Sequence, residues 1–112
     1  MDNTKKDSYY IKKIIIDLDF ILIHTNGVSK EALESNDLWV DSMMFRLIQI
    51  SGNTKLISAD FKTKNSQIPW ESIVGLRNKI VHEYGSVNLS IIFNAIYNDI
   101  PHLRELLKTL AV

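Results

Sequence analysis

The 112-residue chain contains no cysteine, which excludes a disulfide framework and thiolate chemistry at a metal ion or a catalytic nucleophile. It also lacks an excess of either charge, because 13 basic residues balance 13 acidic ones. No global field therefore draws the chain to nucleic acid, and any RNA contact must use a local cluster. The most apolar run, residues 14–23, holds two aspartates and is too short to span a bilayer. Since no secretory signal is visible either, we expect a cytoplasmic protein without membrane contact.

Apolar residues make up 46% of the chain, enough for one modest core, so we predict a single domain over residues 1–112. Their three- and four-residue spacing predicts four main helices. The first covers residues 8–24 and ends at a turn with Gly27. The second is capped by Ser29 or Asn36 and either ends at Gly52 or continues to about residue 57. The third covers residues 69–83, and the last is capped by Asn88, with Val87 placed to pack on Ile92. The expected fold is all-α, a four- to five-helix up-and-down bundle with a kinked C-terminal helix. Residues 1–8 are expected to fray and residues 58–68 to form one long loop.

Three local features add to this outline. Ile16, Phe20 and Ile23 form a second apolar stripe on the first helix, more than one bundle face needs, which favours a subunit interface. Gly75, inside the third predicted helix, costs stability there and indicates close packing against a neighbouring helix. Pro101 predicts the kink in the last helix.

The polar residues of greatest chemical interest lie within residues 76–84, which contain Arg77, Asn78, His82 and Tyr84. If this stretch is helical throughout, Arg77 and Tyr84 share one face, and Asn78 and His82 lie i,i+4 on the adjoining face. Arginine offers forked donors that fit phosphate, and histidine titrates nearest to neutrality. Together they favour phosphoryl chemistry. The alternative is an ordinary solvated helix face, and spacing alone leaves both interpretations open.

The pattern Arg77, four residues, His82, Glu83 and Tyr84 resembles the HepT toxins of the HEPN superfamily. The similarity begins with residues 68–73 and ends with residues 98–101, and a weaker similarity lies at residues 45–50. The resemblance implies an HEPN fold, a homodimer and a cognate MntA-type nucleotidyltransferase antitoxin. It further implies that the two motif helices lie near the dimer axis, so that both copies of Arg77 and His82 line one cleft.

The mechanism that follows is metal-independent and cofactor-free RNA cleavage, in which the 2′-OH of the substrate attacks the adjacent phosphate. His82 would act as general acid or base, Arg77 would stabilise charge on the phosphoryl oxygens, and Asn78 would orient His82 or a phosphate oxygen. Tyr84 would position the RNA backbone or stack on a base. The resemblance implies another role for Tyr84, as the hydroxyl to which the antitoxin transfers AMP groups, blocking RNA entry.

Two other classes of function compete with a ribonuclease. The chain could be a non-catalytic helical partner of a nucleotidyltransferase that uses Arg77 to hold a nucleotide, or a structural dimerisation domain. RNA degradation that depends on both Arg77 and His82 selects the enzyme. Nucleotide binding without degradation selects the binding module.

Overall fold

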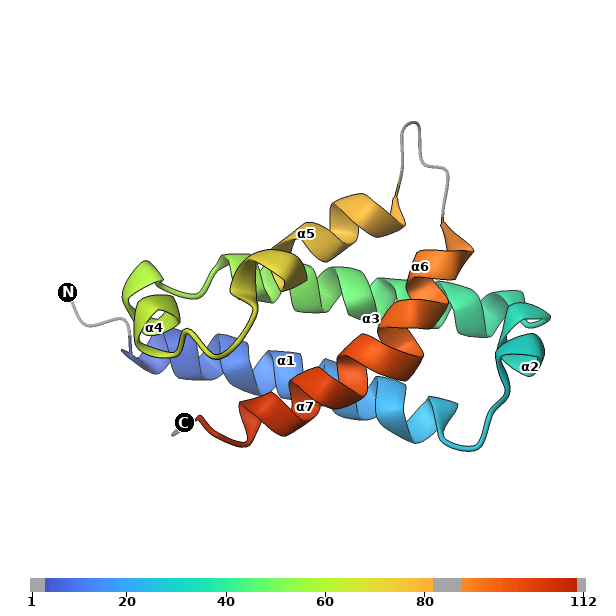
Figure 1. Cartoon of the computed structure of the whole chain (residues 1–112), viewed down its shortest axis with the longest axis horizontal. Coiled ribbons are helices and arrows are strands. Elements are labelled where there is room, and N and C mark those ends of the chain that lie inside the picture. The colour runs from blue at the N-terminus through green and yellow to red at the C-terminus, as the bar shows by residue number, and fades with distance from the viewer. Residues whose placement is uncertain (1–3, 82–87, 111–112) are drawn as a thin grey trace.

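The structure, a computed structural model, describes residues 4–81 and 88–110, and all regular elements within these ranges are helices (Figure 1). They are α1 (Thr4–Thr25), α2 (Lys30–Glu34), α3 (Asp37–Lys55), α4 (Ala59–Lys64), α5 (Trp70–Ile80), α6 (Leu89–Asn94), the π-helix η2 (Ala95–Asp99) and α7 (Ile100–Leu107). The predicted all-α bundle is confirmed. None of these helices is long and apolar enough to cross a lipid bilayer.

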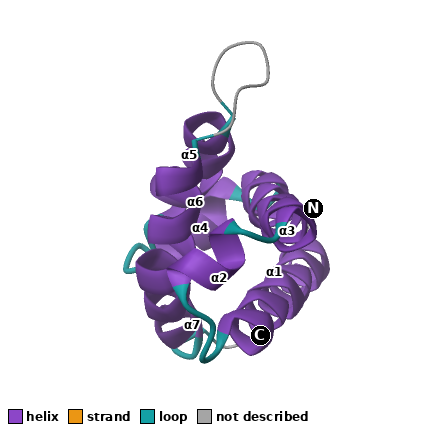
Figure 2. Cartoon of the chain, turned by 90° about the vertical axis from the view of Figure 1, so that its right-hand side faces the viewer, coloured by secondary structure: helices purple, strands orange, loops and turns teal. Residues whose placement is uncertain are grey.

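The helices form two layers. The long helices α1 and α3 run antiparallel and pack against each other, while α5 and the continuous helix α6–η2–α7 cover one side of them (Figure 2). The core lies between the layers and consists of branched aliphatic side chains that are almost fully buried: Ile11, Ile14, Leu18 and Ile21 of α1, Leu47 and Ile50 of α3, and Ile92, Ile96 and Ile100 of the continuous helix. Burial of each such side chain contributes about 1.5–3 kcal/mol to folding, so the core stabilises both layers together.

The start of the chain differs from the prediction, because α1 begins at Thr4 rather than at residue 8. Asp7 is only 4% exposed. Its carboxylate accepts hydrogen bonds from the backbone N–H of Ser58 at 2.8 Å and from the Ser58 hydroxyl at 2.7 Å. The predicted fraying is therefore wrong from Thr4 onward, since a bond to a distant residue holds the first turns of the helix.

The predicted long loop over residues 58–68 is also wrong, because it contains α4. The Ser58 hydroxyl caps this helix by accepting a hydrogen bond from the N–H of Phe61 at 3.2 Å. The indole N–H of Trp70 donates to the carbonyls of Lys62 and Asn65 at 3.1 and 3.0 Å. A helix of six residues is too short to show apolar periodicity, so capping and the indole contacts define it instead.

Most of the predicted helix ends are confirmed. Gly27 has a φ of 73° in the turn after α1, a conformation that glycine adopts without strain. Ser29 caps α2 and Asn36 caps α3, each through a side-chain oxygen that accepts a backbone N–H. Of the two alternatives at Gly52 the structure shows the continuation, because α3 runs through this glycine to Lys55.

The predicted disturbance at Pro101 takes the form of a π-helical turn. Proline has no N–H to donate, and its ring would clash with the carbonyl four residues earlier in an α-helix. The chain widens just before it, where the N–H of Ile100 donates to the carbonyl of Ala95, five residues back. Asn88 caps the start of this long helix, as predicted, with a 3.2 Å bond from the N–H of Ile91. A further predicted contact, of Val87 with Ile92, lies outside the described residues.

Candidate functional site

Helix α5 carries the first half of the candidate motif and is anchored firmly on α3. Trp70 and Ile73 at its start and Ile80 at its end are buried. In its middle, the carbonyl of Val74 accepts a hydrogen bond from the hydroxyl of Ser51 on α3 at 2.6 Å. The helix end that bears Arg77 and Asn78 is thereby held in a fixed position.

The predicted end of this helix near Glu83 is wrong, because α5 ends at Ile80. Val81 has extended backbone angles, with φ −102° and ψ 100°. The carbonyl of Ile80 accepts a hydrogen bond from the N–H of Asn88 at 2.9 Å, whereas in a continuing helix it would accept from residue 84. The predicted helical faces that pair Asn78 with His82 and Arg77 with Tyr84 depend on residues outside the described part of the chain.

Arg77 and Asn78 lie side by side in the last turn of α5, and both are exposed. One guanidinium nitrogen of Arg77 donates to the amide oxygen of Asn78 over 3.3 Å, a long and therefore weak bond. Among the described residues Arg77 makes no other side-chain hydrogen bond or ion pair, and a cation is favoured at this negative end of the helix dipole. His82 and Tyr84, the other two predicted site residues, lie outside the described residues.

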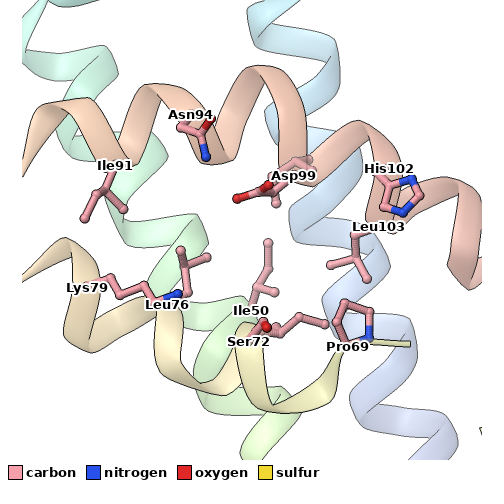
Figure 3. A pocket seen from close by; sticks show the side chains of 12 residues that line it. Ile50, Pro69, Ser72, Leu76, Lys79, Ile91, Asn94, Asp99, His102 and Leu103 are labelled. Atoms are coloured by element: carbon pink, nitrogen blue, oxygen red, sulfur yellow. The ribbon is translucent and has the colours of Figure 1, made fainter. Parts of the chain in front are cut away.

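Helix α5 presents polar side chains on two flanks. Arg77 follows Val74 by three residues and so lies near the flank that bonds to Ser51 of α3. Lys79 lies on the opposite flank, where it lines a cavity between α5 and the α6–η2–α7 helix together with Ser72 (Figure 3). The end of α5 therefore offers two cationic side chains that face different parts of the surface.

Sequence reasoning missed the polar lining of this cavity. Lys79, Asp99 and His102 received no role. His102 is exposed and lines the cavity together with Asp99. The available signal was Pro101, whose π-helical turn changes which residues share a face. Among the described residues, no group of three or more His, Asp or Glu side chains is placed to hold a metal ion.

Comparison with known proteins identifies the family of this chain. The model of the family described as "Ribonuclease HepT-like" matches residues 12–110. "Putative RNase TTE0752" of Caldanaerobacter subterraneus subsp. tengcongensis is 30% identical over 99 residues, which cover 88% of either chain. "Probable ribonuclease HepT" of Thermococcus cleftensis is 32% identical over 62 residues, 54% of this chain and 56% of that protein. No solved structure matches the chain.

The chain therefore belongs to the HepT-like ribonuclease family of the HEPN superfamily. The resemblance inferred from the residue pattern is confirmed, and so is the helical bundle expected from it. The similarity to "Putative RNase MJ0127" of Methanocaldococcus jannaschii, 28% identical over 93% of this chain and 90% of that protein, extends over almost the whole length. Ribonuclease chemistry is thus supported at the level of the family.

Proposed function

We propose that the protein is the toxin of a toxin–antitoxin pair and that it cleaves RNA without a metal ion through Arg77 and His82. The observation that carries this proposal is the match of residues 12–110 to a ribonuclease family, combined with an exposed Arg77 at the fixed end of α5. Arg77 is a permanent cation with forked donors, and so it suits a phosphodiester. Asn78 beside it supplies an amide that can orient a phosphate oxygen or His82.

In the proposed reaction the 2′-oxygen of the substrate attacks the adjacent phosphorus while the bond from phosphorus to the 5′-oxygen breaks. His82 removes the proton of the 2′-OH or gives one to the departing 5′-oxygen, water takes or supplies the other proton, and Arg77 stabilises the charge that builds on the phosphoryl oxygens. The products are a 2′,3′-cyclic phosphate and a 5′-hydroxyl. No nucleophile from the protein is needed.

We further propose a homodimer whose interface includes the outward face of α1 and α3. Ile16 and Ile23 of α1 are 62% and 70% exposed, and Leu38 and Phe45 of α3 are 80% and 57% exposed. Each pair is spaced by seven residues, the spacing of a seam between packed helices. Large exposed apolar patches of this kind mark interaction surfaces, and the resemblance to HepT toxins favours a second copy as the partner.

Light scattering over a concentration series tests this interface. Phe45→Lys should halve the mass of the particle, because a charge placed in an apolar seam costs more than the contact provides. Leu89→Lys is the matched control, since Leu89 is 38% exposed but lies on the other layer. A wild-type protein that stays monomeric at every concentration would overturn the proposal.

For regulation we propose an MntA-type nucleotidyltransferase that transfers AMP to Tyr84. Each AMP would add negative charge and bulk two residues after His82 in the chain, so RNA entry would be blocked electrostatically and sterically. Intact-mass spectrometry after co-expression should show steps of one AMP on a peptide containing Tyr84. Tyr84→Phe should retain toxicity but escape neutralisation. Equal neutralisation of Tyr84→Phe and wild type would contradict this role of the tyrosine.

The ribonuclease activity itself is tested with purified protein, an RNA substrate and EDTA. Cleavage should persist in EDTA, leave 2′,3′-cyclic phosphate ends and disappear in Arg77→Ala. If chelation stops the reaction and magnesium restores it, the metal-free mechanism is wrong. Nucleotide binding without any RNA degradation would instead select the non-catalytic module.

A further inference from the structure

A cavity of about 540 Å³ lies on the flank of α5 opposite to Arg77. Its floor is Ile50 of α3, and its walls are aliphatic side chains of α5 and of the α6–η2–α7 helix (Figure 3). Leu76 and Ile91 face each other across it from opposite helices. The volume lies within the range of small-ligand sites, about 300–1,000 Å³, and Leu76 and Ile91 on opposite walls can pack on the two faces of a flat group.

Polar groups enter this cavity from two sides. Asn94 and Asp99 point into it from the long helix, and Lys79 approaches from α5 on the opposite wall (Figure 3). The amide oxygen of Asn94 already accepts a hydrogen bond from Asn98 at 2.7 Å, so its N–H groups remain as donors. Asp99 makes no hydrogen bond or ion pair with any other side chain in the described part of the chain. The cavity therefore offers a carboxylate on one wall and a cation on the other.

The π-helical turn is what places Asn94 and Asp99 together. In an uninterrupted α-helix, residues five apart point about 140° away from each other. The bond from the N–H of Ile100 to the carbonyl of Ala95 closes a wider, π-helical turn. In such a turn, residues five apart in the sequence lie nearly above one another on the same face of the helix. The turn exists because Pro101 cannot donate a hydrogen bond. Single π-helical turns occur frequently at functional sites, so this one is an observation independent of the cavity.

The chemistry of the lining selects one kind of flat ligand. An ionised carboxylate only accepts hydrogen bonds, and it does so with two adjacent oxygens. Guanine presents two adjacent donors, its ring N–H and its amino group, whereas adenine and cytosine present one donor beside an acceptor and uracil one donor between two acceptors. Lys79, in the same last turn as Arg77, is placed for the phosphate of such a nucleotide.

We infer that this cavity binds a guanine base of the RNA substrate, with Asp99 reading its Watson–Crick edge and Lys79 holding its phosphate. The inference rests on the proposed ribonuclease function and adds a specificity to it. The phosphate that Lys79 holds and the phosphate that Arg77 stabilises are then neighbours along the RNA, one on each flank of the end of α5, and the second of them is cleaved. Cleavage next to guanosine is the consequence.

Titration of the full-length protein with the four 5′-mononucleotides, followed by amide NMR signals, tests the pocket without any cleavage. GMP should shift the signals of Ser72, Leu76, Asn94 and Asp99 and bind at least about tenfold more tightly than AMP, CMP or UMP. Asp99→Asn should remove this preference and favour AMP, because an amide matches the donor and acceptor of adenine. Asp41→Asn, an exposed carboxylate on α3, is the matched control and should change nothing.

Leu76→Trp provides a second variant, which fills the cavity and should abolish GMP binding while circular dichroism stays helical. Equal binding of the four nucleotides, shifts confined to other residues, or unchanged binding in Asp99→Asn would overturn the inference. So would a change of oligomeric mass in Leu76→Trp, because a second copy would then cover the cavity.

Cleavage measured separately keeps the two proposals apart. If the protein binds GMP in the cavity but degrades no RNA, the ribonuclease proposal fails and the guanine pocket stands as a nucleotide site. If it degrades RNA with no preference for guanosine and GMP does not bind, the pocket fails and the ribonuclease stands.

Discussion

The two helical layers differ in the length and regularity of their helices and in the side chains that they expose. Helices α1 and α3 are long, share a partly buried ion pair between Asp17 and Arg46, and expose apolar side chains outward. The second layer has shorter helices, a π-helical turn and a cavity, and it exposes Arg77, Asn78 and Lys79. On the proposals above, the α1/α3 layer provides stability and assembly, while the α5/α6–α7 layer provides the chemistry.

If this division is correct, the largest effect on activity comes from the second layer with little effect on stability. His82→Ala should reduce RNA cleavage by about 10²–10⁴-fold, the usual contribution of general acid–base catalysis. The melting temperature should stay nearly unchanged. His24→Ala is the matched control, since His24 is exposed at the end of α1, and it should cleave like the wild type. A comparable loss of activity in His24→Ala would contradict the assignment of the chemistry to the second layer.

The largest effect on stability should come from the core of the first layer. Leu47→Ala removes a side chain that is 0% exposed and should cost about 3–5 kcal/mol in the free energy of unfolding. Leu103→Ala should cost less, about 2–3 kcal/mol, because Leu103 already borders a cavity and has fewer neighbours to lose. Urea denaturation followed by circular dichroism measures both. Equal losses would show that the cavity is closed in solution.

The ion pair between the first two long helices should contribute less than the core. Arg46 donates to Asp17 at 2.8 Å, with side chains 28% and 6% exposed, and its guanidinium lies 3.9 Å from the ring centre of Phe20. Asp17→Asn leaves Arg46 without its counter-charge in a partly buried place and should cost about 1–3 kcal/mol. Lys64 with Asp60 is the control pair, because both side chains are more than 70% exposed. Asp60→Asn should change the unfolding free energy by less than about 0.5 kcal/mol.

A hydrogen bond also connects the two layers at one end. The hydroxyl of Tyr97 in η2 donates to the carbonyl of Val28 at 2.9 Å. Desolvation, and next the charge of Glu31, raise the pKa of Tyr97 above its usual value of 10.0. A raised folded-state pKa means that this stability is present in full below pH 10 and is lost as the hydroxyl ionises at higher pH. Tyr97→Phe should cost about 0.5–1.5 kcal/mol at pH 7 and should weaken the loss of stability above pH 10.

The sequence was informative wherever a signal is local. Apolar periodicity gave the long helices, and the capping residues Ser29, Asn36 and Asn88 marked three helix starts. Prediction failed where contacts between residues far apart in the sequence determine the structure. Nothing near Asp7 indicates that Ser58 will bind it, and the end of α5 depends on a bond from Asn88 to Ile80 that no helical pattern can reveal.

Part of the candidate site could likewise be predicted from the sequence, and part could not. Arg77 and Asn78 were found because residue type and spacing point to phosphate chemistry, and they lie together on the surface. The cavity of Lys79 and Asp99 was missed because it forms between two segments far apart in the sequence. The roles of His82 and Tyr84 remain predictions, since both lie outside the described residues.

The smallest expected effect concerns the glycines inside the two layers, and it corrects one more prediction. Gly75 was expected to allow close packing, but a Cβ built there would meet nothing within 4 Å, and the same holds for Gly52 in α3. Both have ordinary helical backbone, so alanine fits and lowers the entropy of the unfolded chain. Gly52→Ala and Gly75→Ala should each raise the free energy of unfolding by about 0.5–1 kcal/mol.

Gly27 is the control, because its φ of 73° makes alanine strained, and Gly27→Ala should destabilise the fold. Thermal denaturation of the three variants separates these outcomes. Gly75→Ala carries extra information, since Gly75 lies one turn before the exposed Asn78. If Gly75→Ala stabilises the protein and leaves RNA cleavage unchanged, the glycine has no packing role. If it destabilises the protein or abolishes the dimer, a second copy packs against α5, and assembly would no longer belong to the α1/α3 layer alone.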